Sequence, residues 1–346
     1  MRYFDKQLIT NSRPHAKWWK DVCMDREFFH NSEDHYAGLV GNTAALLPRN
    51  AWRDLDDITR RVMRNDEGQA YMSDLMPLAK AVNIGKLVHI NRVSSDAGRV
   101  VRTMTGQEPA SMDKVVHDFR GTPVPMFLSG YGRSWREWNT LQSENFDALA
   151  DDQEATVAGL NRDMAQYVLR GDSSIVTEGY TGYGLTNHPL TNQIDLGTSG
   201  VNVDFTQATP AEWEAFISQT LGGAMDDNHI GVGVNMYVSP EIGRNLDLGW
   251  SAPDEFKMGS RRDWVAGSRR INKIEVSFEL SGNEMLFFVP NPMFVRPLVG
   301  MAVNTIALPR HAPRANYQFD VSGALGIEVR ADYNERSGVF YASEAT

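Results

Sequence analysis

The sequence predicts an α+β protein. A long helical pattern of apolar residues covers about 141–170, strand-like runs alternate with short helices after residue 209, and further strand-like runs follow to the C-terminus. With 346 residues, the chain is long enough for about two domains with a sizeable core. Its composition, 42% hydrophobic and 23% charged, is typical of a folded globular protein.

Charge and composition exclude several classes of protein. The 34 basic and 44 acidic residues give a net charge of −10 without a long block of like charge, which disfavours nucleic-acid binding through a basic surface. No run approaches 18 apolar residues and the first residues lack an apolar signal region, so we expect neither a membrane span nor a secretory signal. The single cysteine, Cys23, rules out an intramolecular disulfide and fits a reducing cytoplasm.

The first 48 residues mix aromatic and polar residues without a sustained period, and we expect an irregular N-terminal arm there. Its aromatic residues either pack on the body of the same subunit or dock on a neighbouring copy, and both alternatives stay open. A short helix is expected over 50–65, because apolar residues recur there at helical spacing. The candidates for contacts between subunits in the arm are Trp18, Trp19, Phe28 and Phe29.

A long hairpin is expected over 86–128. Residues 84–93 partly alternate as a strand, break at 94–98 and resume at 99–104. The stretch that follows is too polar for a core, so the hairpin should project from the body. Its charged residues are candidates for ion pairs between subunits: Arg99, Arg102, Glu108, Asp113, Asp118 and Arg120.

The clearest helix is expected over 141–170, about 45 Å long at 1.5 Å per residue, with Gly171 as its stop signal. A glycine-rich loop follows over 171–200. Its glycines could cradle a phosphate, but no lysine or arginine occurs between Arg170 and Arg244, so we favour a structural connector that needs positive φ angles and close approach of chains.

The second half alternates helices and strands. Thr209 and Glu212 form a capping box that predicts a helix over 210–222, and a strand over 231–238 leads directly into a helix that starts at Ser239 and Pro240. Further strands are expected at about 271–280, 285–289, 293–299 and 325–342.

Short sequence signatures of catalysis are missing. The sequence contains no Walker A, HExxH, GxSxG or GxGxxG motif. Ser111 and Lys114 match S-x-x-K without its companion triplets, and the donors between His30 and His35 read better as a polar turn than as a metal site. We therefore expect no enzyme activity, no catalytic, cofactor-binding or metal-binding residues and no cofactor.

The end of the predicted long helix and the loop after it resemble a known family. Leu169-Arg170-Gly171-Asp172 followed by Gly184-Leu185-Thr186-Asn187-His188-Pro189 resembles the major capsid proteins of tailed bacteriophages, of the Hong Kong 97 type. Gly184, Leu185 and Asn187 match the motif of that family. The resemblance implies an N-arm (1–48), the start of a P domain (49–85), an extended E-loop hairpin (86–128), a P domain with a spine helix and a glycine-rich loop (129–200), an A domain (201–300) and a return to the P domain (301–346).

The same resemblance implies a structural protein that assembles through pentamers and hexamers into an icosahedral shell. The shell would enclose double-stranded DNA without sequence-specific binding, in the virion capsid, after assembly in the cytoplasm of a bacterial host. Scaffolding, portal and cement or decoration proteins are further partners that the family uses. One branch of the family links subunits through isopeptide bonds, and we expect that Lys114 does not form one.

Two alternatives stay open. One is an encapsulin-like shell that holds cargo enzymes. The other is a soluble α/β enzyme that uses the loop from Gly179 to Pro189 as a substrate lid.

Overall fold

The computed structural model describes residues 68–96, 102–105, 114–137, 148–250 and 259–344. The chain divides into two units, residues 1–62 and 63–346, and all the described residues belong to the second unit. In the described part, no helix is both long and apolar enough to cross a lipid bilayer. Several predicted features lie outside the described residues: the arm, the 50–65 helix, Trp18, Trp19, Phe28, Phe29, Arg99, Glu108 and Asp113.

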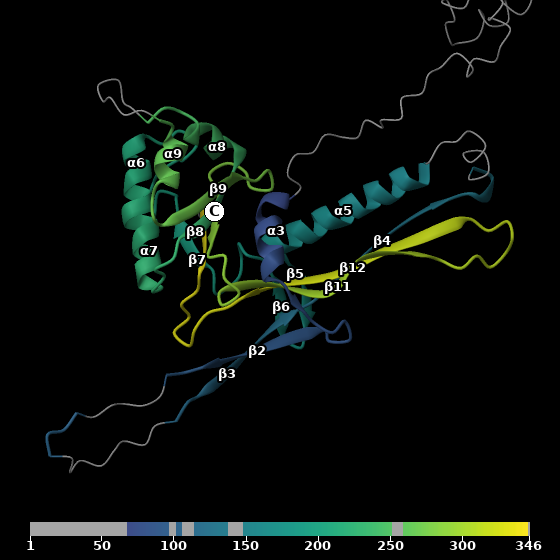
Figure 1. The fold of residues 1–346 in the computed structure, drawn as a ribbon, viewed down its shortest axis with the longest axis horizontal. Helices are drawn as coiled ribbons and strands as arrows, with labels where there is room; N and C mark the ends of the chain where they lie inside the picture. The colour runs from purple at the N-terminus through teal and green to yellow at the C-terminus, as the bar shows by residue number, and fades with distance from the viewer. Residues whose placement is uncertain (1–67, 97–101, 106–113, 138–147, 251–258, 345–346) are drawn as a thin grey trace, which may run out of the picture. The chain divides into compact units, whose positions relative to one another are not determined.

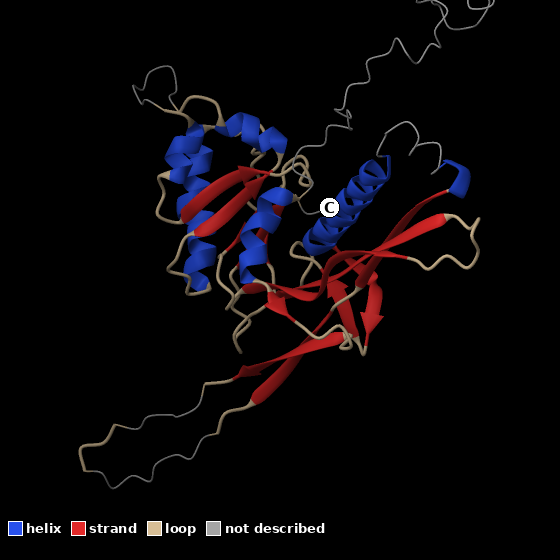
Figure 2. Cartoon of the chain, turned by 45° about the vertical axis from the view of Figure 1, so that its right-hand side comes forward, coloured by secondary structure: helices blue, strands red, loops and turns tan. Residues whose placement is uncertain are grey.

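A four-stranded sheet combines strands from both ends of the described chain (Figures 1 and 2). Its strand order is β1-β11-β12-β4, where β1 is Lys80–Ala81, β11 is Val295–Ala307, β12 is Tyr317–Val329 and β4 is Met126–Arg133. Strands β11 and β12, each 13 residues long, pair antiparallel from Val295 opposite Val329 to Ala307 opposite Phe319 and make the long twisted ribbon in Figure 1. The strand predicted over 293–299 is therefore too short at its C-terminal end.

Helix α5, Ala148–Arg170, packs on one face of this sheet. Leu160, Met164 and Val168 are buried there because the i, i+4 spacing places them on one face of the helix. On the sheet, Phe127 meets Tyr167 of the helix with 5.5 Å between ring centroids. The first residues of the helix predicted over 141–170, up to residue 147, lie outside the described residues.

A second, five-stranded sheet has the order β7-β13-β10-β8-β9. Every residue of β8 and β10 is buried, because both faces of the sheet are covered. Side chains such as Met236 and Phe287 pack with helices α6, α8 and α9, whereas Tyr237 and Phe288 pack with helix α3 and the end of α5. The elements of this part are α3 (Gln69–Leu75), β7 (Asn192–Asp195), α6 (Pro210–Ala215), β8 (Val234–Val238), α8 (Pro240–Leu246), α9 (Arg261–Ala266), β9 (Ile271–Val276), β10 (Met285–Phe288) and β13 (Val339–Ser343).

Two small antiparallel hairpins lie beside the sheets. In the first, β2 (Val88–Ser94) pairs with β3 (His117–Pro123) in a register that runs from Val88 opposite Pro123 to Ser94 opposite His117. In the second, β5 (Gly171–Thr177) pairs with β6 (Tyr180–Tyr183), so the glycine-rich segment holds regular strands that its sequence did not predict. A 3-10 turn, η4 (Met76–Leu78), follows α3.

The helix predicted over 210–222 is longer than its sequence indicates. The capping box of Thr209 and Glu212 is present, but the helix continues through η5 (Phe216–Leu221), a π-helical turn, into α7 (Gly222–Asp227). Leu221 and Met225 are both buried in the core, four residues apart on one face of the helix. Their burial outweighs the cost of Gly222 and Gly223, about 1 kcal/mol per glycine.

The prediction of one strand over 325–342 is wrong. Strand β12 ends at Val329 and β13 begins at Val339, in a different sheet. The carboxylate of Asp332 accepts hydrogen bonds from the backbone amides of Asn334 and Arg336, both at 2.9 Å, and Glu335 has a φ of 63°. This side-chain-stabilised turn interrupts the extended backbone.

Candidate assembly surfaces

One face of the β2–β3 hairpin is exposed. Ile90 is 50% exposed and Phe119 is 60% exposed, while the alternate residues Asn91 and Val93 are buried. Leu87, just before β2, is 67% exposed. Since a two-stranded ribbon has no core of its own, these apolar side chains have no cover within the ribbon itself.

The charged candidates on this hairpin that the structure describes are Arg102, Asp118 and Arg120. Arg102 is exposed. Asp118 and Arg120 lie 3.6 Å apart between Oδ2 and Nε and form an ion pair within the hairpin. The structure thus gives these two residues a partner within the subunit, which the sequence did not predict.

The loop with the family motif caps the C-terminus of α5. The backbone amide of Leu185 donates to the carbonyl of Val168 at 2.9 Å, and the amide and hydroxyl of Thr186 donate to the carbonyl of Leu169 at 3.0 and 2.9 Å. The last carbonyls of a helix lack partners within the helix, so these bonds complete its end. Gly171 follows the helix with a φ of 67°, the conformation that favours glycine.

Gly184 is required by close backbone contact. A Cβ atom at this position would lie 2.3 Å from the nitrogen of Gly171 and 2.6 Å from the carbonyl oxygen of Leu169. Asn187 accepts a hydrogen bond from the amide of Gly184 at 2.7 Å, and Leu185 is fully buried. The three motif residues Gly184, Leu185 and Asn187 therefore hold the loop against the helix.

This geometry bears on the two interpretations of the glycine-rich loop. The amides of Gly184, Leu185 and Thr186 all donate to protein acceptors. Amides in this state are not free to bind an anion, which favours the structural connector over a phosphate cradle.

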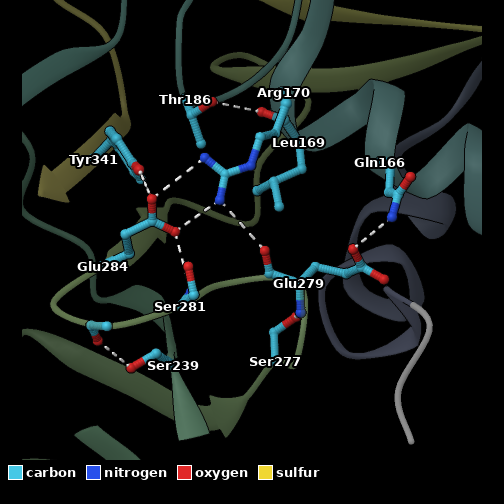
Figure 3. Close-up of polar contacts among 11 residues, drawn as sticks. Gln166, Leu169, Arg170, Thr186, Ser239, Ser277, Glu279, Ser281, Glu284 and Tyr341 are labelled. Atoms are coloured by element: carbon cyan, nitrogen blue, oxygen red, sulfur yellow. Dashed lines mark hydrogen bonds and ion pairs between the residues drawn. The ribbon is translucent and has the colours of Figure 1, made fainter. Parts of the chain in front are cut away.

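An ion pair connects the end of α5 to the second sheet (Figure 3). Arg170 donates through Nη2 to Oε2 of Glu284 at 2.8 Å and through Nη1 to Oε1 at 3.3 Å. Tyr341 of β13 donates to the same carboxylate at 2.9 Å, and the amide of Ser281 donates at 3.2 Å. Burial alone would raise the pKa of Glu284, but these hydrogen bonds lower it below its usual value.

A second polar cluster connects α3 to the same sheet. Asp74 accepts a hydrogen bond from the hydroxyl of Tyr237 and one from Asn235 at 3.1 Å. Lys273 of β9 lies 3.0 Å from the carboxylate of Asp74. Burial, together with the hydrogen bond to Asp74, raises the pKa of Tyr237, so its hydroxyl stays a donor.

A buried ion pair lies in the first sheet. Glu328 of β12 is 1% exposed and pairs with Arg296 opposite it on β11. One carboxylate oxygen of Glu328, Oε1, has no hydrogen-bond partner among the described residues.

Sequence reasoning missed Glu284, Asp74 and Glu328. For Glu328 the signal is present, because a carboxylate stands in the apolar run 324–329. No metal-like cluster of three His, Cys, Asp or Glu side chains occurs in the part of the chain that the structure describes.

Residues 42–342 match the protein family described as "Family of unknown function (DUF6260)". The chain belongs to this family. A comparison with curated protein sequences finds no match.

Solved structures similar to this member of the family come from capsids and phages. It is similar to a chain of the capsid of Myoviridae phage XM1, with 11% identity, a TM-score of 0.64 and coverage of 87% of this chain and 99% of that chain. It is also similar to the capsid of a native GTA particle, with 12% identity, a TM-score of 0.58 and coverage of 88% and 99%. A structure from Microbacterium phage Oxtober96 has 14% identity, a TM-score of 0.57 and coverage of 85% and 95%.

These similarities confirm the predicted α+β class. They also show that the chain has the fold of phage capsid proteins, which its resemblance to the Hong Kong 97 type implies.

Proposed function

We propose that this chain is a major capsid protein, a structural protein that assembles with copies of itself into a closed icosahedral shell around double-stranded DNA. Its assembly units are pentamers and hexamers, and in the mature virus it forms part of the virion capsid. Its partners include scaffolding, portal and cement or decoration proteins.

The exposed apolar face of the β2–β3 hairpin is the observation that carries the proposal. Ile90 and Phe119 are at least half exposed on a two-stranded ribbon that cannot bury them itself. A second copy that covers this face would remove these side chains from water, at about 25 cal/mol for each Å² of apolar surface.

Charge supports a contact with a second copy. Among the described residues of this hairpin, Lys86, Arg92, Arg102, Lys114 and Arg120 outnumber Asp96 and Asp118, whereas the whole chain has a net charge of −10. A basic element on an acidic protein is attracted to another copy of that protein. The contacts are expected to include the candidates of the arm and hairpin: Trp18, Trp19, Phe28, Phe29, Arg99, Arg102, Glu108, Asp113, Asp118 and Arg120.

The test is electron microscopy and size-exclusion chromatography of the purified full chain. We expect closed particles or discrete pentamers and hexamers, and the double variant Ile90→Ser/Phe119→Ser is expected to stay a folded monomer. The matched control, Ile90→Val/Phe119→Leu, keeps the face apolar and should assemble as the parent does.

Two results would contradict the proposal. One is a monomer or dimer of the parent chain under all assembly conditions, including co-expression with a scaffold. The other is normal assembly of the Ile90→Ser/Phe119→Ser variant. Particles that enclose a cargo protein instead of DNA would favour the encapsulin-like alternative.

A further inference from the structure

One histidine lies at the base of the β2–β3 hairpin, and a second lies in the loop after β6. His89 belongs to β2, and its side chain is on the same face of the ribbon as Arg120 of β3, because Asn91 pairs with Arg120 and His89 is two residues from Asn91. His188 follows the family motif in the loop after β6. The base of the hairpin contacts β6 directly, because a Cβ atom on Gly121 of β3 would lie 2.6 Å from the ring of Tyr180 in β6.

His89 accepts a hydrogen bond from a cation. Nζ of Lys80 lies 3.4 Å from Nε2 of His89. A lysine ammonium group has donors and no acceptor, so Nε2 is the acceptor and the imidazole is neutral. This contact joins the hairpin to β1, which pairs with β11 in the first sheet.

The charges around His89 are mainly positive. Burial lowers the pKa of His89, the negative charge of Glu328 acts in the opposite direction, and three cations lower it further. The groups that face His89 are Glu328, Lys80, Arg296 and Arg330. Glu328 is already paired with Arg296, so a charged His89 would meet an excess of positive charge.

His188 has a similar environment on the other side of the contact. Its Nδ1 accepts a hydrogen bond from the amide of Leu190 at 3.1 Å, which makes this imidazole neutral as well. Its ring packs edge-on against Tyr183, with 5.6 Å between centroids. Burial lowers the pKa of His188 to about 4, and the positive charge of Arg120 acts in the same direction.

We propose that the base of the β2–β3 hairpin is an acid-sensitive hinge, held closed by the neutral His89, which accepts a hydrogen bond from Lys80, and supported by the neutral His188, which accepts a hydrogen bond from Leu190. His89 accepts its hydrogen bond from a cation on β1, whereas His188 accepts from an amide of its own loop and experiences the positive charge of Arg120 from β3. A proton on His89 removes the acceptor of Lys80 and places two like charges side by side. A proton on His188 breaks its hydrogen bond with Leu190 and adds a charge that Arg120 repels, so the hairpin loosens from the body.

The lowered pKa values determine how the stability of the closed state changes with pH. Both histidines bind a proton more weakly in the folded chain than in the unfolded chain, so the closed state is fully stable above about pH 6.5. Stability is lost as the pH falls below that value, and for His188 the loss continues to about pH 4. If the proposed function holds, acid would loosen the element that covers the next subunit.

Hydrogen exchange of the full chain tests the hinge. Amide exchange in β2 and β3 is measured at pH 7 and pH 4.5, corrected for the intrinsic exchange rate, with the assembly state checked at both values. We expect protection to fall about tenfold or more at pH 4.5, the population change that one unit of pKa shift produces. In the double variant His89→Gln/His188→Asn, amide oxygens replace Nε2 and Nδ1 as acceptors that do not titrate, so the fall should be less than about threefold.

His117 provides the matched control. It lies on the same hairpin, and its Nδ1 is 2.9 Å from the neutral hydroxyl of Ser94. The variant His117→Asn should keep the full response to acid. The hinge is overturned if the parent chain keeps its protection at pH 4.5, or if the double variant loses as much protection as the parent. Hydrogen exchange can be measured on a chain that does not assemble into a shell. The proposal of the hinge and the proposal of the capsid function can therefore fail independently.

Discussion

Arg170, the last residue of α5, holds Glu284 through two hydrogen bonds of 2.8 and 3.3 Å. Glu284 lies just before β10, 114 residues further along the chain. The pair therefore fixes the end of the long helix to the second sheet, beside the buried apolar cluster to which Leu169 and Phe288 both belong.

Glu284→Gln should lower the free energy of unfolding by about 1 kcal/mol at pH 7, at the low end for a charged hydrogen bond because Arg170 is half exposed. The pKa of Glu284 is lowered in the folded chain, so this contribution is present above the unfolded pKa of about 4.5 and is lost as the pH falls below it. Urea denaturation at pH 7 and pH 3.5 measures the difference, which should shrink at pH 3.5. An equal difference at both pH values would contradict this account.

Gly184→Ala should destabilise the chain by about 3 kcal/mol or more, because its Cβ would overlap backbone atoms of Gly171 and Leu169 that cannot move freely. The control is Gly179→Ala, at a φ of 84° with no atom within 4 Å of the added Cβ. It should cost about 1 kcal/mol, since only the backbone conformation is unfavourable. Thermal unfolding of both variants checks the order, and equal losses would show that close contact is not the reason for Gly184.

Gly159→Ala should stabilise the chain by about 0.5–1 kcal/mol. Gly159 lies within α5, where a Cβ atom meets nothing within 4 Å, and alanine has the higher helix propensity. The midpoint of urea unfolding should rise without a change in slope. A lower midpoint would mean that α5 has a neighbour at this position.

Tyr237→Phe should cost about 1–2 kcal/mol, because it removes the hydroxyl that donates to Asp74 and leaves that carboxylate with fewer donors. The stacking of ring 237 on Phe288 is kept, with 5.1 Å between centroids in the parent chain. The matched control is Tyr333→Phe, whose side chain is exposed and should change stability by less than 0.5 kcal/mol or so. Similar values for the two variants would show that the Asp74 cluster does not stabilise the fold.

Local signals in the sequence predicted local structure well. The capping box at Thr209 and the Ser239-Pro240 pair both begin helices in the structure. The sequence pattern gave the wrong end for the helix that continues past Gly222, because burial of Met225 in the core extends that helix. It also missed the turn that the side chain of Asp332 stabilises. The motif residue Gly184 was found by resemblance, but its reason, contact with Gly171 and Leu169, needs coordinates.

The polar clusters could not be predicted for the same reason. His188 and Arg120 are 68 positions apart, and no periodicity relates them. The same holds for Asp74 and Lys273, which meet because α3 contacts Tyr237 of β8 and β8 pairs with β9.

The pairing of β1 with β11 has a consequence for synthesis on the ribosome. Lys80 and Leu298 are direct partners in this parallel pair, so the first sheet cannot form completely until nearly the whole chain has left the ribosome. Contacts between residues so far apart in sequence slow folding, whereas the β2–β3 hairpin joins nearby segments and can form early. A nascent chain would therefore present its apolar hairpin before the sheet that supports it exists, and a fragment that ends before residue 295 should aggregate rather than fold.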